Sequence, residues 1–188
     1  MGKKGFDAFW AELSPCAHVL QIYEDDTVLL DNLSEFVAGG VVQAETAVVI
    51  ATPEHLKGLK SRLSSMGIAV EAAQNRGELI LLDAQETMSK FLVDKWPDEH
   101  LFRKTISDIL EKATHDGRKV RAFGEMVALM WSQGFCGATI RLEHLWTDLC
   151  REQSFSLFCA YPKIGFTGDA ADDIRRVCDL HTAVAGEA

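Results

Sequence analysis

Short apolar runs alternate with amphipathic segments along most of the chain. An unbroken apolar run is typical of a strand buried on both faces, whereas apolar residues at every third or fourth position indicate a helix. The apolar runs predict five strands, at residues 17–23, 46–51, 78–84, 119–124 and 154–161. Strands that alternate with helices form a mainly parallel sheet covered by helices on both faces. The expected fold class is therefore three-layer α/β.

Helices are predicted from apolar spacing together with capping residues, prolines and glycines. They are expected at residues 5–13, from Asp26 or Thr27 to Gly39 and Gly40, from Pro53 to before Gly67, from a cap at Asp83 through Met88, Phe91 and Leu92, at residues 98–115, in the pair GEMVALMWSQG and TIRLEHLWTDLCRE, and at residues 169–184. No internal repeat or linker rich in proline or glycine separates them. We therefore expect one domain, with an N-terminal helix within residues 1–14, a core over 17–162 and a C-terminal helix over 169–184.

Composition and charge narrow the classes of function. The 188 residues carry a net charge of -9, which disfavours binding to nucleic acid or to an anionic membrane because both need a basic surface. No apolar run of about 20 residues and no signal peptide is present, so a cytoplasmic location is expected. The five cysteines are scattered and form no CxxC pair, so we expect reduced thiols without a zinc knuckle.

The turn after the first strand argues against a nucleotide enzyme. It reads Tyr23, Glu24, Asp25, Asp26 and Thr27, where a phosphate-binding loop would supply glycines and a lysine. Three carboxylates repel a triphosphate unless a metal ion lies between them. Nucleotide hydrolysis is therefore not expected, and the turn is interpreted as a solvated loop with a helix cap.

Several motifs in order resemble the MEDS domain, a sensory domain named for methanogen and methylotroph regulators that include a dichloromethane-responsive regulator. They are HVLQIYEDD, VVIATPEHLKGL, LDAQETMSKF, VRAFGEMVALMW, RLEHLWTDL and FSLFCAYP, which extend from about Ala17 to Pro162. The resemblance implies a RecA/KaiC-like core that has lost its phosphate loop. It also implies sensing of a small molecule, with simple hydrocarbon derivatives as the class.

The family resemblance also bears on partners. Such domains are often joined to a histidine kinase or a DNA-binding module, and the chain holds no segment long enough for either. We therefore expect either that the signal passes to a separate histidine kinase or transcription regulator, or that the chain is one piece of a larger protein. The sequence leaves the cofactor unknown.

Candidate ligand-binding residues lie where strands end, because open parallel sheets bind ligands beyond the carboxyl ends of their strands. His18, at the start of the first strand, is retained only through the family resemblance. The full candidate set is Tyr23, His55, Glu125, Cys159, Tyr161 and His18.

Each candidate also has a structural interpretation. Tyr23 and Tyr161 are equally typical of amphipathic core residues, His55 of an exposed first helical turn, Cys159 of a small buried hydrophobe, and Asp83 of a helix cap rather than a ligand. Glu125 is the most informative candidate, since it could orient a ligand, hold a metal or pair with Arg121 or Arg141. A metal set of His18, His55, Glu125 and Cys159 is chemically coherent, but its spacing carries no signature, so no metal is predicted.

Three functions remain to be compared. The first is a non-enzymatic sensory module that moves the segment Trp96–Asp98 and the helix pair after Gly124. The second is a ligand-free interaction module that docks a partner, or a second copy as a homodimer, through Phe6, Phe9 and Trp10. The third, an enzyme, is disfavoured because neither a GK[ST] loop nor a Cys/His pairing is recognisable.

Overall fold

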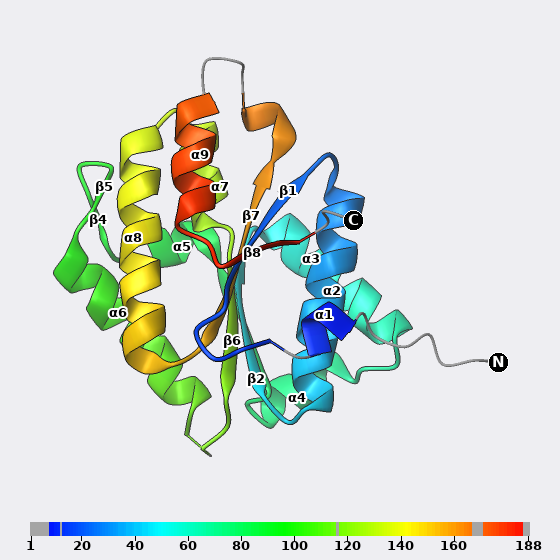
Figure 1. Cartoon of the computed structure of the whole chain (residues 1–188). Coiled ribbons are helices and arrows are strands. Elements are labelled where there is room, and N and C mark those ends of the chain that lie inside the picture. Colours follow the sequence, from blue (N-terminus) through cyan, green and yellow to red (C-terminus); the bar gives the residue numbers. More distant parts are fainter. Residues whose placement is uncertain (1–7, 12, 116, 167–170, 186–188) are drawn as a thin grey trace.

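The computed structural model describes residues 8–11, 13–115, 117–166 and 171–185 (Figure 1). Its main sheet has the strand order β3-β2-β6-β7-β1-β8, and all neighbouring strands are parallel. The strands are β1 (His18–Tyr23), β2 (Thr46–Ala51), β3 (Leu79–Asp83), β6 (Val120–Gly124), β7 (Ser156–Pro162) and β8 (Ala183–Ala185). The sheet therefore has six strands, and the expected number of five was wrong.

Helices cover both faces of the sheet, as the alternating pattern predicted. One layer consists of α1 (Ala8–Ala11), α2 (Asp26–Val42), α3 (Pro53–Ser65) and α4 (Val70–Asn75), and it lies to the right of the sheet in Figure 1. The opposite layer consists of α5 (Ala84–Ser89), α6 (Glu99–Ala113), α7 (Met126–Ser132), α8 (Cys136–Gln153) and α9 (Ala171–Asp179). Each layer encloses its own apolar core, which confirms a three-layer α/β architecture.

The C-terminal segment differs from the predicted helix over 169–184. Helix α9 ends at Asp179, and β8 then pairs in parallel with β1, Ala183 opposite Val19 and Ala185 opposite Gln21. Thr182 reinforces this pairing, because its backbone N–H donates to the His18 carbonyl over 2.7 Å. The open edge of β1 offers unpaired backbone groups, and this long-range pairing outweighs the helical pattern of a short segment.

A second correction concerns the helix expected through Phe91 and Leu92. Helix α5 ends at Ser89, and a small antiparallel hairpin follows, β4 (Leu92–Val93) and β5 (Trp96–Pro97). Asp94 and Lys95 between them have φ angles of 48° and 65°. Two successive residues with positive φ form the turn that suits a tight hairpin, and Pro97 disfavours continuation of the helix.

The helix after β1 is capped by Asp25, not by Asp26 or Thr27. The Asp25 carboxylate accepts hydrogen bonds from the backbone N–H groups of Thr27, at 2.8 Å, and Val28, at 3.2 Å. The expected cap at Asp83 is confirmed, since its carboxylate accepts from the N–H of Glu86 over 2.7 Å.

Helix α2 continues through the glycine pair that was expected to end it. Gly40 packs against the buried Arg121 side chain so closely that an added Cβ would lie 2.7 Å from its Cδ. Arg121 pairs with Glu45 and donates to the Trp10 and Phe36 carbonyls. The glycine therefore serves close packing rather than helix termination.

The N-terminal helix is partly described, by α1 alone. Trp10 is buried and packs against Phe36 and Phe158, with ring centroids 5.4 Å and 4.8 Å away. It therefore belongs to the core and offers no exposed surface to a partner. Phe9 remains exposed, whereas Phe6 lies outside the described residues.

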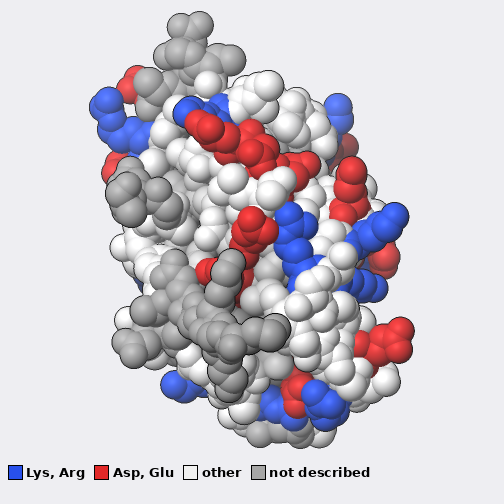
Figure 2. Space-filling model, turned by 90° about the vertical axis from the view of Figure 1, so that its right-hand side faces the viewer, with Lys and Arg blue, Asp and Glu red and all other residues white. Residues whose placement is uncertain are grey.

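Charged side chains on the α1–α4 side are mixed rather than segregated. In Figure 2, over the described part of this face, Lys and Arg lie singly or in small groups among Asp and Glu, with no continuous basic surface. Salt bridges join several of them, including Arg62 with Asp31 at 2.8 Å.

Candidate functional site

The six candidate residues form two groups that lie on opposite faces of the sheet. Tyr23 faces the apolar core beneath α2 and α3, whereas Cys159 and Tyr161 face the core beneath α8. Side chains alternate along a strand, so His18 points to the same face as Leu20 and away from Tyr23. The structure therefore does not bring all six residues together.

The first group is joined by Asp26 and is called the carboxyl-edge cluster: Tyr23, Asp26, His55 and Glu125. Glu125 Oε1 lies 2.8 Å from His55 Nδ1, and Glu125 Oε2 accepts from the backbone N–H of Thr52 over 2.8 Å. His55 Nε2 lies 3.4 Å from Asp26 Oδ1. The cluster thus spans the loops after three parallel strands, β1, β2 and β6.

Local sequence explains this placement. Thr52 caps α3 by accepting from the His55 N–H, and Pro53 follows at the start of the helix, which sets His55 in the first turn. The N–H of Glu125 donates to the Ile50 carbonyl over 2.9 Å and thereby fixes the end of β6 against β2. The alternative in which Glu125 pairs with Arg121 or Arg141 is wrong, because these arginines pair with Glu45 and Glu99.

Electrostatics in the carboxyl-edge cluster favour a charged histidine. The hydrogen bond to Glu125 raises the pKa of His55, and it outweighs the opposite effect of burial. Burial raises the pKa of Tyr23, and the charges of Glu125 and Asp26 raise it further. The cluster therefore favours the protonated imidazolium of His55 and the neutral phenol of Tyr23, both of which can donate hydrogen bonds.

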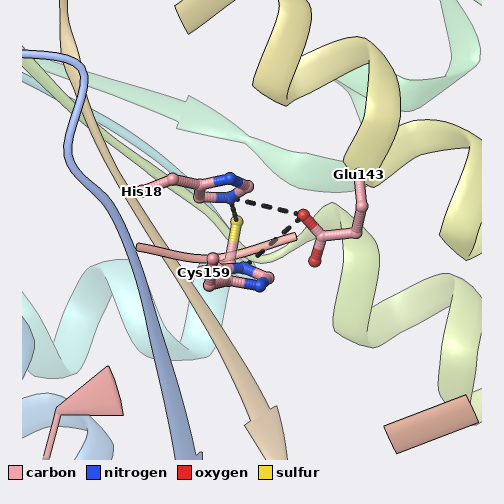
Figure 3. Close-up of side chains that lie close together, drawn as sticks. His18, Glu143 and Cys159 are labelled. Atoms are coloured by element: carbon pink, nitrogen blue, oxygen red, sulfur yellow. Dashed lines mark hydrogen bonds and ion pairs between the residues drawn. The ribbon is translucent and has the colours of Figure 1, made fainter. Parts of the chain in front are cut away.

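The second group is called the buried cluster: His18, Glu143, Cys159 and His181. One possible metal-ligating atom from each residue lies within 4.8 Å of every other. His18 Nε2 lies 3.4 Å from Cys159 Sγ and 3.4 Å from Glu143 Oε2, as Figure 3 shows. His181 Nε2 lies 3.7 Å from the same carboxylate oxygen.

Three elements and one connecting segment supply the buried cluster. His18 begins β1, Cys159 lies within β7, Glu143 lies within α8, and His181 follows α9. Cys159 pairs in register with Leu20, so it points to the same face as His18. Glu143 and His181 lie in segments read from sequence as helix interior, which explains why they were missed.

Neighbouring groups orient these side chains. The Tyr161 hydroxyl donates to Glu143 Oε1, and His181 Nδ1–H donates to the Val177 carbonyl over 2.6 Å. His18 Nδ1 lies 3.2 Å from Thr147 Oγ1. Each contact uses the atom turned away from the cluster, which leaves His18 Nε2, His181 Nε2 and Glu143 Oε2 converging on Cys159.

Burial and neighbouring charges shift the pKa values of the side chains in the buried cluster. Burial raises the pKa of Cys159 well above its usual value, and the Glu143 carboxylate adds to this effect. Burial would raise the pKa of Glu143, but the charge of His181, the contact with His18 and the hydrogen bond from Tyr161 outweigh it and lower that pKa. Burial lowers the pKa of His181. Among the described residues, Glu143 Oε2 and His181 Nε2 make no hydrogen bond.

A hollow of about 540 Å³ lies away from both clusters. Its lining includes Val120, which begins β6, and Phe155, which precedes β7. This position is at the amino ends of the strands, opposite to where open parallel sheets bind ligands. We therefore place the candidate sites at the two clusters.

Comparison with known families agrees with the sequence motifs. The model of the family described as MEthanogen/methylotroph, DcmR Sensory domain (MEDS) matches residues 17–181, a range that includes both clusters. No curated protein matches the chain. Within the part of the chain that the structure describes, every helix is too short or too polar to span a bilayer. The chain therefore belongs to the MEDS family of sensory domains.

Proposed function

We propose that this sensory domain binds a small molecule at the carboxyl-edge cluster and relays binding to a histidine kinase or a transcription regulator. The observation that carries the proposal is the His55–Glu125 pair, with Nδ1 and Oε1 2.8 Å apart, beneath the starts of three helices. Helix α2 begins at Asp26, α3 at Pro53 and α7 at Met126. A ligand held by this pair contacts the elements that must move.

The hydrogen-bonding groups indicate the class of ligand. The hydrogen bond to Glu125 favours the protonated form of His55, and the Nε2 of His55 faces Asp26, whose side chain is 66% exposed. An oxygen atom of a ligand can replace this weakly held carboxylate and accept from His55, with the Tyr23 hydroxyl as a second donor. We therefore assign a simple hydrocarbon derivative that bears a hydroxyl or carbonyl oxygen.

Relay requires that the ligand favour one conformation over another. Displacing Asp26 releases the first turn of α2 from α3, and α2 packs along α3. Any change at Glu125 passes directly to α7, which begins at the next residue. The proposed movement therefore involves α2 and α7 relative to a fixed sheet.

The same geometry favours a non-enzymatic role. Asp25 already occupies N–H groups at the start of α2 that a phosphate would need, which supports a RecA/KaiC-like core whose phosphate loop has been lost. Cys159 is fully buried and its pKa is raised, so it lacks the exposed thiolate of a nucleophile.

The test is isothermal titration calorimetry with short-chain alcohols, aldehydes, ketones and carboxylic acids. Glu125→Gln removes the charge that holds His55 protonated, and we expect it to weaken binding at least about ten-fold, the equivalent of one charged hydrogen bond. Glu54→Gln, an exposed change one residue from His55, is the matched control and should bind normally. Equal binding by both variants, or no binding by the unaltered chain, would refute the proposal.

One observation favours a second candidate, an interaction module. Val93 and Trp96 are 50% and 52% exposed on the β4–β5 hairpin. Exposed large apolar side chains on a protruding turn are typical of contact surfaces. Light scattering of Trp96→Ala beside the unaltered chain separates the cases, since a lower mass for the variant would assign this hairpin to a homodimer.

A further inference from the structure

We propose that the buried cluster binds a transition-metal ion of the zinc class through His18, Glu143, Cys159 and His181. All four side chains are nearly or fully buried, and their donor atoms converge from β1, β7, α8 and the segment between α9 and β8. This site lies on the opposite face of the sheet from the carboxyl-edge cluster, so the proposal does not depend on the function proposed above.

Three of the six separations between the four donor atoms match tetrahedral coordination, and the other three are within 4.8 Å. Zinc binds sulfur at about 2.3 Å and imidazole nitrogen or carboxylate oxygen at about 2.0–2.2 Å, so neighbouring ligand atoms of a tetrahedron lie about 3.3–3.8 Å apart. The measured separations are 3.4 Å from His18 Nε2 to Cys159 Sγ, 3.4 Å from His18 Nε2 to Glu143 Oε2, and 3.7 Å from His181 Nε2 to Glu143 Oε2.

The outer contacts are those that metal ligands require. A ligating imidazole binds through one nitrogen while the other donates to a carbonyl or hydroxyl group. His181 Nδ1 bonds the Val177 carbonyl, and His18 Nδ1 lies beside Thr147 Oγ1, which leaves both Nε2 atoms for a metal. Tyr161 similarly holds Glu143 Oε1 and leaves Oε2 free.

Two buried atoms lack hydrogen-bond partners among the described residues. Glu143 Oε2 and His181 Nε2 both belong to the converging set, and leaving a buried polar group unpaired is costly. A divalent cation satisfies both at once. With Cys159 as thiolate, Glu143 as carboxylate and two neutral histidines, the two negative charges balance the metal charge in a dry interior.

A catalytic triad does not account for this arrangement. In such a triad the acid contacts the imidazole nitrogen opposite to the one facing the nucleophile. Here Cys159 and Glu143 both face His18 Nε2, and Nδ1 contacts Thr147 instead. Convergence on one point is the geometry of coordination.

The ligand set also selects the metal. One thiolate, two imidazoles and one carboxylate suit zinc or a similar borderline-soft ion, whereas magnesium and calcium prefer oxygen ligands. Four protein ligands close a tetrahedral site and leave no position for a substrate. The metal would therefore have a structural or regulatory role, by tying His181 and the segment that leads into β8 to the sheet.

The experiment begins with the full chain stripped of metal by a chelator and then reconstituted with zinc. Elemental analysis after desalting should find about one zinc per chain. Cys159→Ser should lose most of this zinc. Cys136→Ser and His144→Gln are matched controls, since Cys136 lies outside the cluster and His144 is exposed beside Glu143, and both should retain it.

A second measurement avoids dependence on the folding of a variant. Cobalt added to the unaltered metal-free chain should produce visible bands of a tetrahedral site together with thiolate-to-cobalt absorption in the near ultraviolet. Tyr161→Phe should keep this spectrum and weaken cobalt affinity about 10–100-fold. Absence of the thiolate band, or equal zinc in Cys159→Ser and the controls, overturns the proposal. Glu125→Gln should still bind zinc, so failure at the carboxyl edge is recognisable separately.

Discussion

His18 and Cys159 lie 141 positions apart in the chain, yet the Nε2 of one is 3.4 Å from the Sγ of the other. In the parallel pairing of β1 with β7, Leu20 is opposite Cys159. His18 precedes Leu20 by two residues, so its side chain lies on the same face of the sheet as the Cys159 side chain and can contact it. This contact places the buried cluster in the interior of the protein, away from the carboxyl ends of the strands.

Tyr161→Phe should destabilise the fold. The hydroxyl donates to Glu143 Oε1 within the interior, and its removal leaves a buried carboxylate oxygen without a donor. The expected loss in the free energy of unfolding is about 1–3 kcal/mol, measured by urea denaturation. Tyr23→Phe is the matched control, with a smaller expected loss. Equal stability of the two variants would show that the Tyr161 hydroxyl contributes nothing.

The His55–Glu125 pair predicts a pH dependence of stability. The pKa of His55 is raised above its usual 6.5 in the folded chain, so folding favours the protonated form. This contribution is fully present below pH 6.5 and is lost as the pH rises through the raised pKa. Urea denaturation across this range should show the loss in the unaltered chain and not in Glu125→Gln. Parallel profiles for the two proteins would contradict the assignment.

Gly40→Ala in α2 should lower the free energy of unfolding more than Gly58→Ala in α3. A Cβ at Gly40 meets the Arg121 Cδ at 2.7 Å, and Arg121 is fixed by bonds to Glu45 and two backbone carbonyls. We expect a loss of about 1–3 kcal/mol. Gly58→Ala is the comparison, because its Cβ would meet only the end of the flexible Leu30 side chain. Thermal denaturation of both variants decides the point.

Metal removal should loosen the end of the chain before it loosens the sheet. If zinc joins His181 to His18, a chelator should speed hydrogen exchange at Thr182 and Val184, while β6 at the sheet centre stays protected. Mass spectrometry of exchanged peptides measures both regions. Uniform protection with and without chelator would contradict a metal-dependent attachment of β8.

Much of the fold could be predicted from sequence because buried strands are unbroken apolar runs. TAVVIA and the run before Asp83 needed no long-range information, and the cap at Asp83 followed from local chemistry. Strand β8 could not be predicted in this way, since AVA has no strong preference and takes its structure from the edge of β1.

The site was harder to predict for a related reason. Tyr23, His55 and Glu125 follow strand ends, so their proximity is a consequence of parallel topology. Glu143 and His181 join the buried cluster only through the packing of α8 and α9, which no local pattern reveals. The available signal was Glu143 itself, a charge between the core positions Leu142 and Trp146.

The pairing of β8 with β1 has a consequence for how the chain folds. During synthesis the central strands are complete long before residues 183–185 exist, so the edge of β1 remains unpaired until these residues have been made. Closing contacts between residues this far apart carries a large loss of chain entropy and tends to be slow. A strand made after all the others of the sheet therefore covers the edge most able to pair with another chain. Its arrival would mark the time at which the newly made domain becomes safe from aggregation.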